Sequence, residues 1–324
     1  MANLKEIKPH VVNSSPQDKI WLFYGPPGTR KTTVALGKPD ETLLLAYEIG
    51  YKFIPGVYAL NLTNWHSFKD AVNQLKDPDI KERFKTITID TIGLAYKACI
   101  TYICNMKGVA EIGQIPYGQG YALAKNEFEK TINSIPQLGY GLVMVAHSDE
   151  LNDEKNGVSV KVDIDKRPSS VIKGMADFIL YARKEQVENS EDPNNMTVYA
   201  YSETNNPNIE VKSRARFFPR KIEFTYENIV SGLKKAISEQ DKLFNVKSEE
   251  EPDFEIYKEE EVDLEKVQND VIQLIQTLSK MNYGEEISKI VNNHLHGKRI
   301  SETTKANLAS LYAITDELTE LREK

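Results

Sequence analysis

The stretch WLFYGPPGTRKTTVAL, residues 21–36, is the feature that most constrains how this chain folds. An apolar run typical of a strand, IWLFY (20–24), leads into a turn of glycine and proline, and Lys31, Thr32 and Thr33 then begin a helical pattern. The spacing G-x-x-x-x-[G]-K-[S/T] supplies free backbone N–H groups, a lysine and a hydroxyl at a helix N-terminus, which are the parts of a phosphate-binding loop. We therefore expect a strand–loop–helix unit that binds nucleotide phosphates.

Arg30 departs from this pattern, because the position before the lysine ordinarily holds a second glycine. Glycine lets the backbone lie close to a phosphate, whereas arginine has to direct its side chain outward or add its charge to the phosphates. Binding should survive this change more readily than turnover. A surface turn is the competing interpretation of GPPGT alone. The expected nucleotide contacts are Gly25, Pro26, Pro27, Gly28, Thr29, Arg30, Lys31, Thr32 and Thr33.

Apolar runs alternate with helical patterns through most of the chain. Helical patterns follow Lys31 and occupy 65–77, 91–106 and 121–135. Short, nearly continuous apolar runs are typical of strands buried on both faces, so the alternation predicts an α/β fold with a mostly parallel central sheet. The expected strands are IWLFY (20–24), TLLLAY (42–47), VYALN (57–61), TITID (86–90), GLVMVAH (141–147), DFILYAR (177–183) and MTVYAYS (196–202).

The distribution of charge separates a body from a tail. Residues 1–247 carry 30 acidic and 32 basic side chains, whereas residues 248–324 carry 18 acidic and 9 basic ones. We predict a domain at 1–247, an acidic linker at 248–262 and a small helical C-terminal module at 263–324. The segments with helical periodicity in this module are 267–281, 285–295 and 301–321, the last opened by SETT.

The sequence predicts a protein of a reducing cytoplasm that does not enter a membrane. No apolar run approaches the roughly 18–20 residues that span a bilayer, and the N-terminus lacks the apolar centre of a signal peptide. Cys99 and Cys104 are five positions apart in one helical pattern, on different faces, which argues against a disulfide. His294 and His296 stand without further ligands, so we expect no metal there.

A phosphate loop of this kind calls for a second apolar strand that ends in an acidic residue. FKTITIDTIG supplies one at Asp90, 59 residues after Lys31. Hydroxyl and carboxylate oxygens are the ligands that Mg²⁺ prefers, so we predict Thr32 and Asp90 as the metal site. A lone aspartate after a strand is usually a turn or a helix cap, and only the upstream loop favours the metal.

The segments GPPGTRKTT, LLLAYEIG, ITIDTIG and GLVMVAHSDE, in this order, resemble RecA-like ATPases. IPYGQGYALAKNEFEK (115–130) and KRPSSVIKGMADFILYARK (166–184) are similar to segments of phage-encoded RecA-like proteins associated with single-strand annealing and recombination. The resemblance covers residues 18–235. It implies a RecA-like P-loop NTPase core that uses ATP and Mg²⁺, and a location in the cytoplasm of a bacterial host.

The resemblance also assigns roles to two side chains of the expected site. Glu48, in AYEIG, occupies the place of the catalytic base, and His147, in VMVAHS, the place of the residue that senses the γ-phosphate. Chemistry supports Glu48 independently, because a water that attacks a phosphate needs a nearby carboxylate. A solvent-facing loop glutamate and an ordinary half-buried histidine are the competing interpretations.

The segment after His147 is polar, and its pattern predicts a hairpin that turns at an Asn-Gly pair. In RecA-like proteins the loops after this strand bind DNA. The residues that would contact single-stranded DNA phosphates are Lys155, Lys161, Lys166 and Arg167. Six acidic residues accompany them, so a solvated hairpin of mixed charge is the alternative.

EVKSRARFFPRKIEF (210–224) is a basic segment near the end of the core. Strand alternation would place Lys212, Arg214 and Arg216 on one face. The resemblance implies that such residues reach the γ-phosphate of a neighbouring subunit, where a cation stabilises the transition state, so Lys212 and Arg214 join the catalytic candidates with Lys31. This implies self-association into a ring or filament. A basic strand edge that discourages aggregation is the other interpretation.

Taken together, these features predict an ATP-binding and ATP-hydrolysing recombination protein that acts on single-stranded DNA. The main alternative is a nucleotide-gated interaction protein with little hydrolysis, in which Arg30 limits turnover and the C-terminal module binds a protein partner. A small-molecule kinase would need an arginine-rich lid, which the sequence does not show. A packaging motor is disfavoured because no second carboxylate cluster suggests a nuclease.

Overall fold

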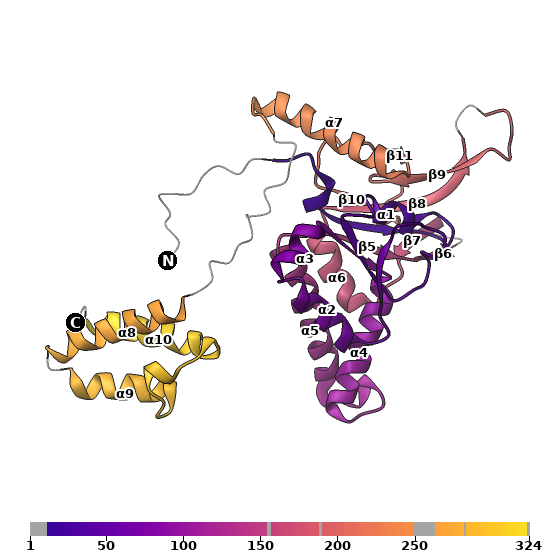
Figure 1. The fold of residues 1–324 in the computed structure, drawn as a ribbon. Helices are drawn as coiled ribbons and strands as arrows, with labels where there is room; N and C mark the ends of the chain where they lie inside the picture. The colour runs from indigo at the N-terminus through magenta and orange to yellow at the C-terminus, as the bar shows by residue number, and fades with distance from the viewer. Residues whose placement is uncertain (1–11, 154–156, 188–189, 249–262, 282, 323–324) are drawn as a thin grey trace. The chain divides into compact units, whose positions relative to one another are not determined.

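The computed structural model contains two compact units, Met1–Lys258 and Glu259–Lys324, which are taken separately below (Figure 1). The expected acidic linker at 248–262 falls, apart from Ser248, outside the described residues. No helix in the described part of the chain is long and apolar enough to cross a bilayer. The structure describes residues 12–153, 157–187, 190–248, 263–281 and 283–322.

The larger unit is built on a nine-stranded sheet with the order β11-β9-β8-β1-β5-β4-β2-β3, in which β10 also pairs with β8. The strands from β8 to β3 run parallel, β9 and β10 each pair antiparallel with β8, and β11 pairs antiparallel with β9. The expected α/β fold with a mostly parallel sheet is therefore confirmed. The strands are β1 (Ile20–Tyr24), β2 (Thr42–Ala46), β3 (Tyr58–Asn61), β4 (Thr86–Asp90), β5 (Gly141–Ala146), β8 (Phe178–Gln186), β9 (Met196–Tyr201), β10 (Lys212–Ser213) and β11 (Lys221–Glu223).

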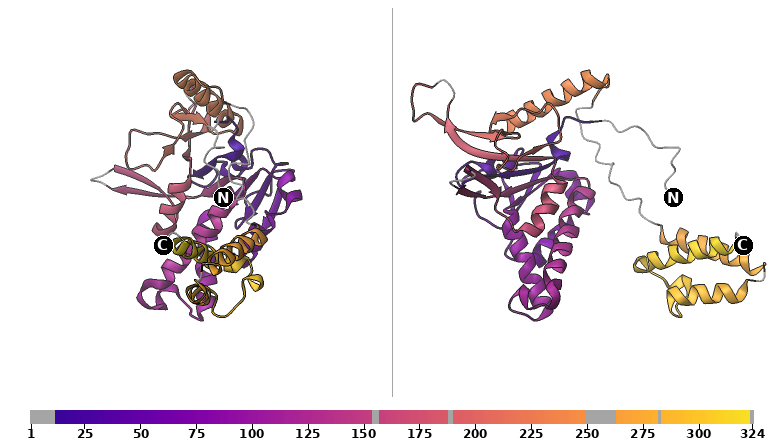
Figure 2. Two further views of the ribbon diagram at one scale, coloured as in Figure 1. Left: turned by 90° about the vertical axis from the view of Figure 1, so that its left-hand side faces the viewer. Right: turned by 180° about the vertical axis from the view of Figure 1, so that it is seen from behind.

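Helices cover both faces of this sheet, which explains why its central strands are apolar throughout (Figure 2). One face packs against α2, α3, α4, α5 and α6, and the other against α1 and α7. The two faces carry separate apolar cores, each with stacked aromatic rings such as Trp65 on Phe68 and Trp21 on Phe178. The helices are α1 (Lys31–Leu36), α2 (Trp65–Gln74), α3 (Pro78–Arg83), α4 (Ile92–Lys107), α5 (Gln119–Gln137), α6 (Lys166–Met175) and α7 (Tyr226–Phe244).

The hairpin expected after β5 forms a separate two-stranded sheet of β6 (Ser148–Asp153) and β7 (Gly157–Val162). A single bridge between Val160 and Ile209 joins it to the segment that precedes β10. Since the hairpin begins directly after β5, it stands at the carboxyl end of the parallel strands.

Two parts of the larger unit differ from the sequence expectations. The expected helices do not include α3, α6 or α7, although α7 has a Thr225 N-cap and buries Ile229, Leu233 and Ile237 along one side. The continuous strand face expected for Lys212, Arg214 and Arg216 is wrong. Of these basic residues and their neighbours in the segment, only Lys212 and Ser213 pair with β8. The Arg214 N–H donates instead to the carbonyl of Asp177, just before β8.

The smaller unit is a three-helix module with its own apolar core. Its last helix begins at Leu308 rather than at SETT, because two short 3₁₀ turns, Ile300–Glu302 and Lys305–Asn307, precede it. The Gln268 amide holds this segment by donating to the carbonyls of Ile300 and Thr303. The helices are α8 (Leu264–Ser279), α9 (Gly284–Leu295) and α10 (Leu308–Arg322).

Candidate active site

The phosphate loop leaves the carboxyl end of β1 directly beside β8. Tyr24 is in register with Tyr181, and a Cβ atom on Gly25 would stand only 2.1 Å from the carbonyl oxygen of Ala182. Any side chain at Gly25 would therefore collide with the neighbouring strand. Gly28 has a φ of +77°, a left-handed conformation that favours glycine. Both glycines thus have backbone roles that shape the loop.

Arg30 holds the left-handed backbone conformation at the point where the loop turns into α1. Its φ and ψ are 58° and 22°, and it is the N-cap residue of that helix. An L-residue in this conformation costs roughly 1–2 kcal/mol, which a glycine would avoid. The side chain is exposed and makes no hydrogen bond or ion pair with the described residues. The arginine therefore occupies the glycine position without changing the course of the loop.

Lys31, the first residue of α1, folds back into the loop. Its ammonium donates hydrogen bonds of 2.8 Å to the carbonyls of Gly25 and Pro26, and the side chain is almost fully buried. Burial lowers the pKa of Lys31, and the carboxylates of Asp90 and Glu48 partly oppose that shift. A buried ammonium with only partial compensation is suited to bind an anion such as phosphate.

Thr32 and Asp90, the two expected metal ligands, are in direct contact. The Thr32 hydroxyl donates to Asp90 Oδ2 over 2.6 Å, and Asp90 is buried at the end of β4. Burial raises the pKa of Asp90, a shift that the hydrogen bond from Thr32 opposes and the charge of Glu48 increases. The Lys31 ammonium compensates the Asp90 charge only in part, since the pKa of Asp90 remains raised, and a hydroxyl with a carboxylate is a donor set that fits Mg²⁺.

Gly50 is a residue of this site that sequence reasoning missed. A Cβ atom at this position would lie 3.4 Å from Thr32 Oγ1 and 3.9 Å from Asp90 Oδ2, so the backbone passes close to the pair. The signal was present in the sequence, because the glycine stands two positions after Glu48 in AYEIG.

Glu48 and His147 come from the ends of two different strands and meet at the same edge. Glu48 Oε2 lies 3.2 Å from His147 Nε2. The backbone N–H of Glu48 donates to the carbonyl of Asp90, which fixes the segment after β2 against the metal pair. The His147 Nδ1 atom is buried and has no hydrogen-bond partner among the described residues. The structure thus places the expected base and the expected sensor together, beside the expected metal ligands.

Lys212 and Arg214 lie elsewhere. Lys212 belongs to β10, which pairs with the first residues of β8 at the amino end of the parallel strands, and Arg214 follows directly after β10. Lys212 donates to the carbonyls of Lys173 and Gly174 at the end of α6, and Arg214 donates to the Gly174 carbonyl and the Asp177 carboxylate. The structure does not bring either cation to the phosphate loop of the same chain.

The expected DNA contacts are distributed along the hairpin and the start of α6. Lys155 lies outside the described residues. Lys161 is exposed on β7, and Lys166 and Arg167 are exposed in the first turn of α6. The Arg167 guanidinium stacks over the Tyr121 ring at 3.7 Å.

A cleft opens between this hairpin and the phosphate loop, with walls that include Pro26, Glu150, Tyr181, Arg183 and Asn206.

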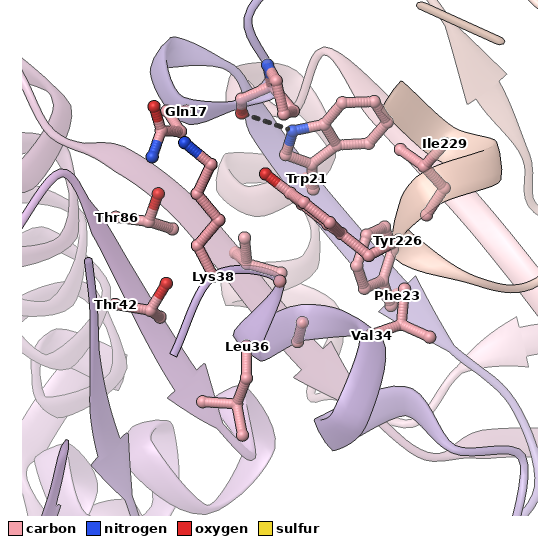
Figure 3. A pocket seen from close by; sticks show the side chains of 14 residues that line it. Gln17, Trp21, Phe23, Val34, Leu36, Lys38, Thr42, Thr86, Tyr226 and Ile229 are labelled. Atoms are coloured by element: carbon pink, nitrogen blue, oxygen red, sulfur yellow. Dashed lines mark hydrogen bonds between the residues drawn. The ribbon is translucent and has the colours of Figure 1, made fainter. Parts of the chain in front are cut away.

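Figure 3 shows a different cavity, at the other end of α1 from the phosphate loop. Its walls include Leu36 and Lys38 at the end of that helix, and Thr42 and Thr86 at the first positions of β2 and β4. The aromatic rings of Trp21 and Tyr226 also line it. Because none of the loop residues from Gly25 to Lys31 lines it, this cavity is no part of the site described above.

Comparison with protein families agrees with this geometry. A family model described as an AAA domain matches residues 17–215, which is more than half of the chain. The chain belongs to the AAA domain family. The match spans the phosphate loop, Glu48, Asp90 and His147, and membership of this family indicates a P-loop ATPase-like fold that binds and hydrolyses nucleotide. No curated protein gives a significant match.

Proposed function

We propose that this AAA-family chain hydrolyses ATP with Mg²⁺ and acts on single-stranded DNA as a phage-encoded recombination protein of the RecA-like type. The observation that carries the proposal is the contact between Thr32 and Asp90, at 2.6 Å, beside the Glu48–His147 pair. A hydroxyl, two carboxylates and an imidazole from four separate segments gather at the one edge where open α/β sheets bind ligands.

Each side chain has a defined part in hydrolysis. Glu48 orients the attacking water and accepts its proton, and His147 Nε2 holds the Glu48 carboxylate toward the phosphates. Lys31 leaves the carbonyls of Gly25 and Pro26 and bonds to the β- and γ-phosphates. Thr32 and Asp90 would hold Mg²⁺, which when bound neutralises charge on the phosphate oxygens.

The hairpin supports the assignment to single-stranded DNA. The Asp163 N–H, just past β7, donates to the His147 carbonyl, so the hairpin is tied to the residue beside Glu48. Lys161, Lys166 and Arg167 present positive charge near this point, and Arg167 stacked on Tyr121 forms a flat cationic surface of the kind on which bases stack. We infer that DNA bound here would influence hydrolysis through His147.

We also propose that the protein assembles into a ring or filament and that the C-terminal module binds a protein partner. The module has its own apolar core of Val271, Leu278, Leu311, Ile314 and Leu318, which suits an independently folded attachment. A phage-encoded protein with these properties would act in the cytoplasm of the bacterial host.

ATP hydrolysis measured with and without single-stranded DNA tests the proposal. We expect magnesium-dependent turnover that single-stranded DNA stimulates, and Lys31→Ala should abolish most ATP binding in calorimetry because the phosphates lose their main buried cation. Wild-type affinity in Lys31→Ala would overturn the phosphate-loop assignment. ATP binding without turnover in any DNA condition would instead support a nucleotide-gated interaction protein.

A further inference from the structure

Strand β8 continues past the phosphate loop and carries a lysine over it. Because Tyr181 is in register with the last residue of β1, the next residues of β8 lie beside the loop itself. The close approach of Gly25 to the Ala182 carbonyl holds the loop backbone against β8. The residues that follow on β8 therefore have a fixed position relative to the loop.

Lys184 points to the side of the sheet on which α1 lies. Side chains alternate along a strand, so Lys184 shares a face with Ala182, and Ala182 packs in the same apolar core as Val34 and Ala35 of α1. The Lys184 ammonium stands 3.7 Å from the position of a Cβ atom on Gly28. A second positive charge thus stands against the tip of the phosphate loop.

Lys184 differs from its charged neighbours on β8 in having no partner for its charge within the described part of the chain. Arg183 donates to Glu185, and Glu185 also accepts from Tyr201 and pairs with Lys221. The Lys184 side chain is exposed and forms no hydrogen bond or ion pair with any residue that the structure describes. Its position is not explained by a structural ion pair.

We propose that Lys184 is a second phosphate-binding cation of the nucleotide site, one that contacts the phosphate chain of a nucleoside di- or triphosphate from the β8 side of the loop. Lys31 approaches the phosphates from within the loop, and the Thr32–Asp90 pair lies on the side of β4. Lys184 supplies positive charge on the opposite side, next to a loop whose Arg30 side chain makes no hydrogen bond or ion pair with the described residues. This inference rests on the proposed function.

The test compares charge-removing and charge-preserving variants of the full chain by calorimetry with Mg²⁺–ATP and Mg²⁺–ADP. Lys184→Met keeps the length of the side chain and should weaken binding by about 10- to 100-fold, the loss expected for a hydrogen bond to a charged group. Lys184→Arg should stay within a few-fold of wild type. Lys235→Met removes an exposed lysine on α7, far from the loop in sequence, and should leave the affinity unchanged.

Three further outcomes test the role of Lys184. The Lys184→Met effect should shrink as salt rises, because an exposed ammonium is screened. Unchanged affinity in Lys184→Met, together with lost binding in Lys31→Ala, would overturn the role of Lys184 and leave the nucleotide site standing. Unchanged affinity in Lys31→Ala would overturn the nucleotide site and the role of Lys184 with it.

Discussion

Two clusters of charged side chains lie at opposite ends of the parallel strands. At the amino end, Lys212 and Arg214 donate to backbone carbonyls at the end of α6 and to Asp177, and the Asp177 carboxylate also accepts from the Ile20 N–H. At the carboxyl end, Asp90 is buried with one hydroxyl as donor, and Glu48 adds a second negative charge nearby.

The difference shows what each end is built for. Cations bonded to the carbonyls at a helix C-terminus are stabilising, because they meet the negative end of the helix and oxygens that would otherwise lack donors. A buried carboxylate with a second carboxylate nearby destabilises the folded chain until a cation compensates it. We therefore expect substitutions at the amino end to act mainly on stability, and those at the carboxyl end to act mainly on chemistry.

The largest effect is expected from Glu48→Gln. The amide keeps the shape of the side chain but cannot take a proton from water, so hydrolysis should fall by roughly 10²-fold or more while ATP binding is retained. Steady-state turnover and calorimetry on the same preparation measure the two quantities. Unchanged turnover would mean that Glu48 is only a loop residue and that the base lies elsewhere.

Asp90→Asn should separate stability from function most clearly. The amide still accepts the Thr32 hydrogen bond but carries no buried charge, so the variant should be more stable. We expect its midpoint temperature of unfolding to rise by about 2–4 °C, which corresponds to roughly 1 kcal/mol of unfolding free energy in a domain of this size. Magnesium-dependent hydrolysis should be lost. Thermal unfolding without nucleotide, beside turnover assays, tests both statements.

The gain in stability expected for Asp90→Asn should depend on pH in one direction. The pKa of Asp90 is raised on folding, so the cost of its ionised form begins to fall as the pH drops below the raised pKa and is gone below the ordinary pKa of an unfolded aspartate. The stability advantage of Asp90→Asn over wild type should therefore shrink on acidification. An advantage that grows at low pH would contradict the assignment of a raised pKa.

Arg214→Ala probes the amino end. It removes the ion pair with Asp177, which is partly exposed, so the loss in stability should be about 1 kcal/mol or less. Denaturant unfolding measures this. If Arg214 instead acts on the phosphate of a neighbouring subunit, Arg214→Ala should lose hydrolysis while its ATP affinity stays unchanged. Mixing this variant with Glu48→Gln protein should then partly restore hydrolysis. That result would contradict the division into a stabilising amino end and a chemical carboxyl end.

Arg30→Gly should have the smallest effect. Glycine adopts the left-handed conformation without strain, but it also increases the conformational entropy of the unfolded chain. The net gain in stability should therefore be about 1 kcal/mol at most. Because the Arg30 side chain has no partner among the described residues, the turnover rate should change little. An inactive wild type that becomes an ATPase on this substitution would instead favour the nucleotide-gated alternative.

Local patterns allowed much of this molecule to be predicted. The loop, the buried strands β1, β4 and β5, and the helical character of the tail all have signals within about twenty residues, since period and turn chemistry depend on neighbours in the chain. Asp90 could be found because the loop upstream calls for an acidic residue at the end of a strand. Helix α7 also has a local signal, in its N-cap and its apolar side.

By itself the sequence determined the α/β class, the phosphate loop and the identity of Lys31, Thr32 and Asp90 as candidates, because these follow from spacing along the chain. Only the tertiary structure decided that Glu48 meets His147, that Lys212 and Arg214 lie at the other end of the sheet, and that Lys184 stands over Gly28. The physical reason is strand pairing, whose order and register place residues far apart in sequence at the same edge.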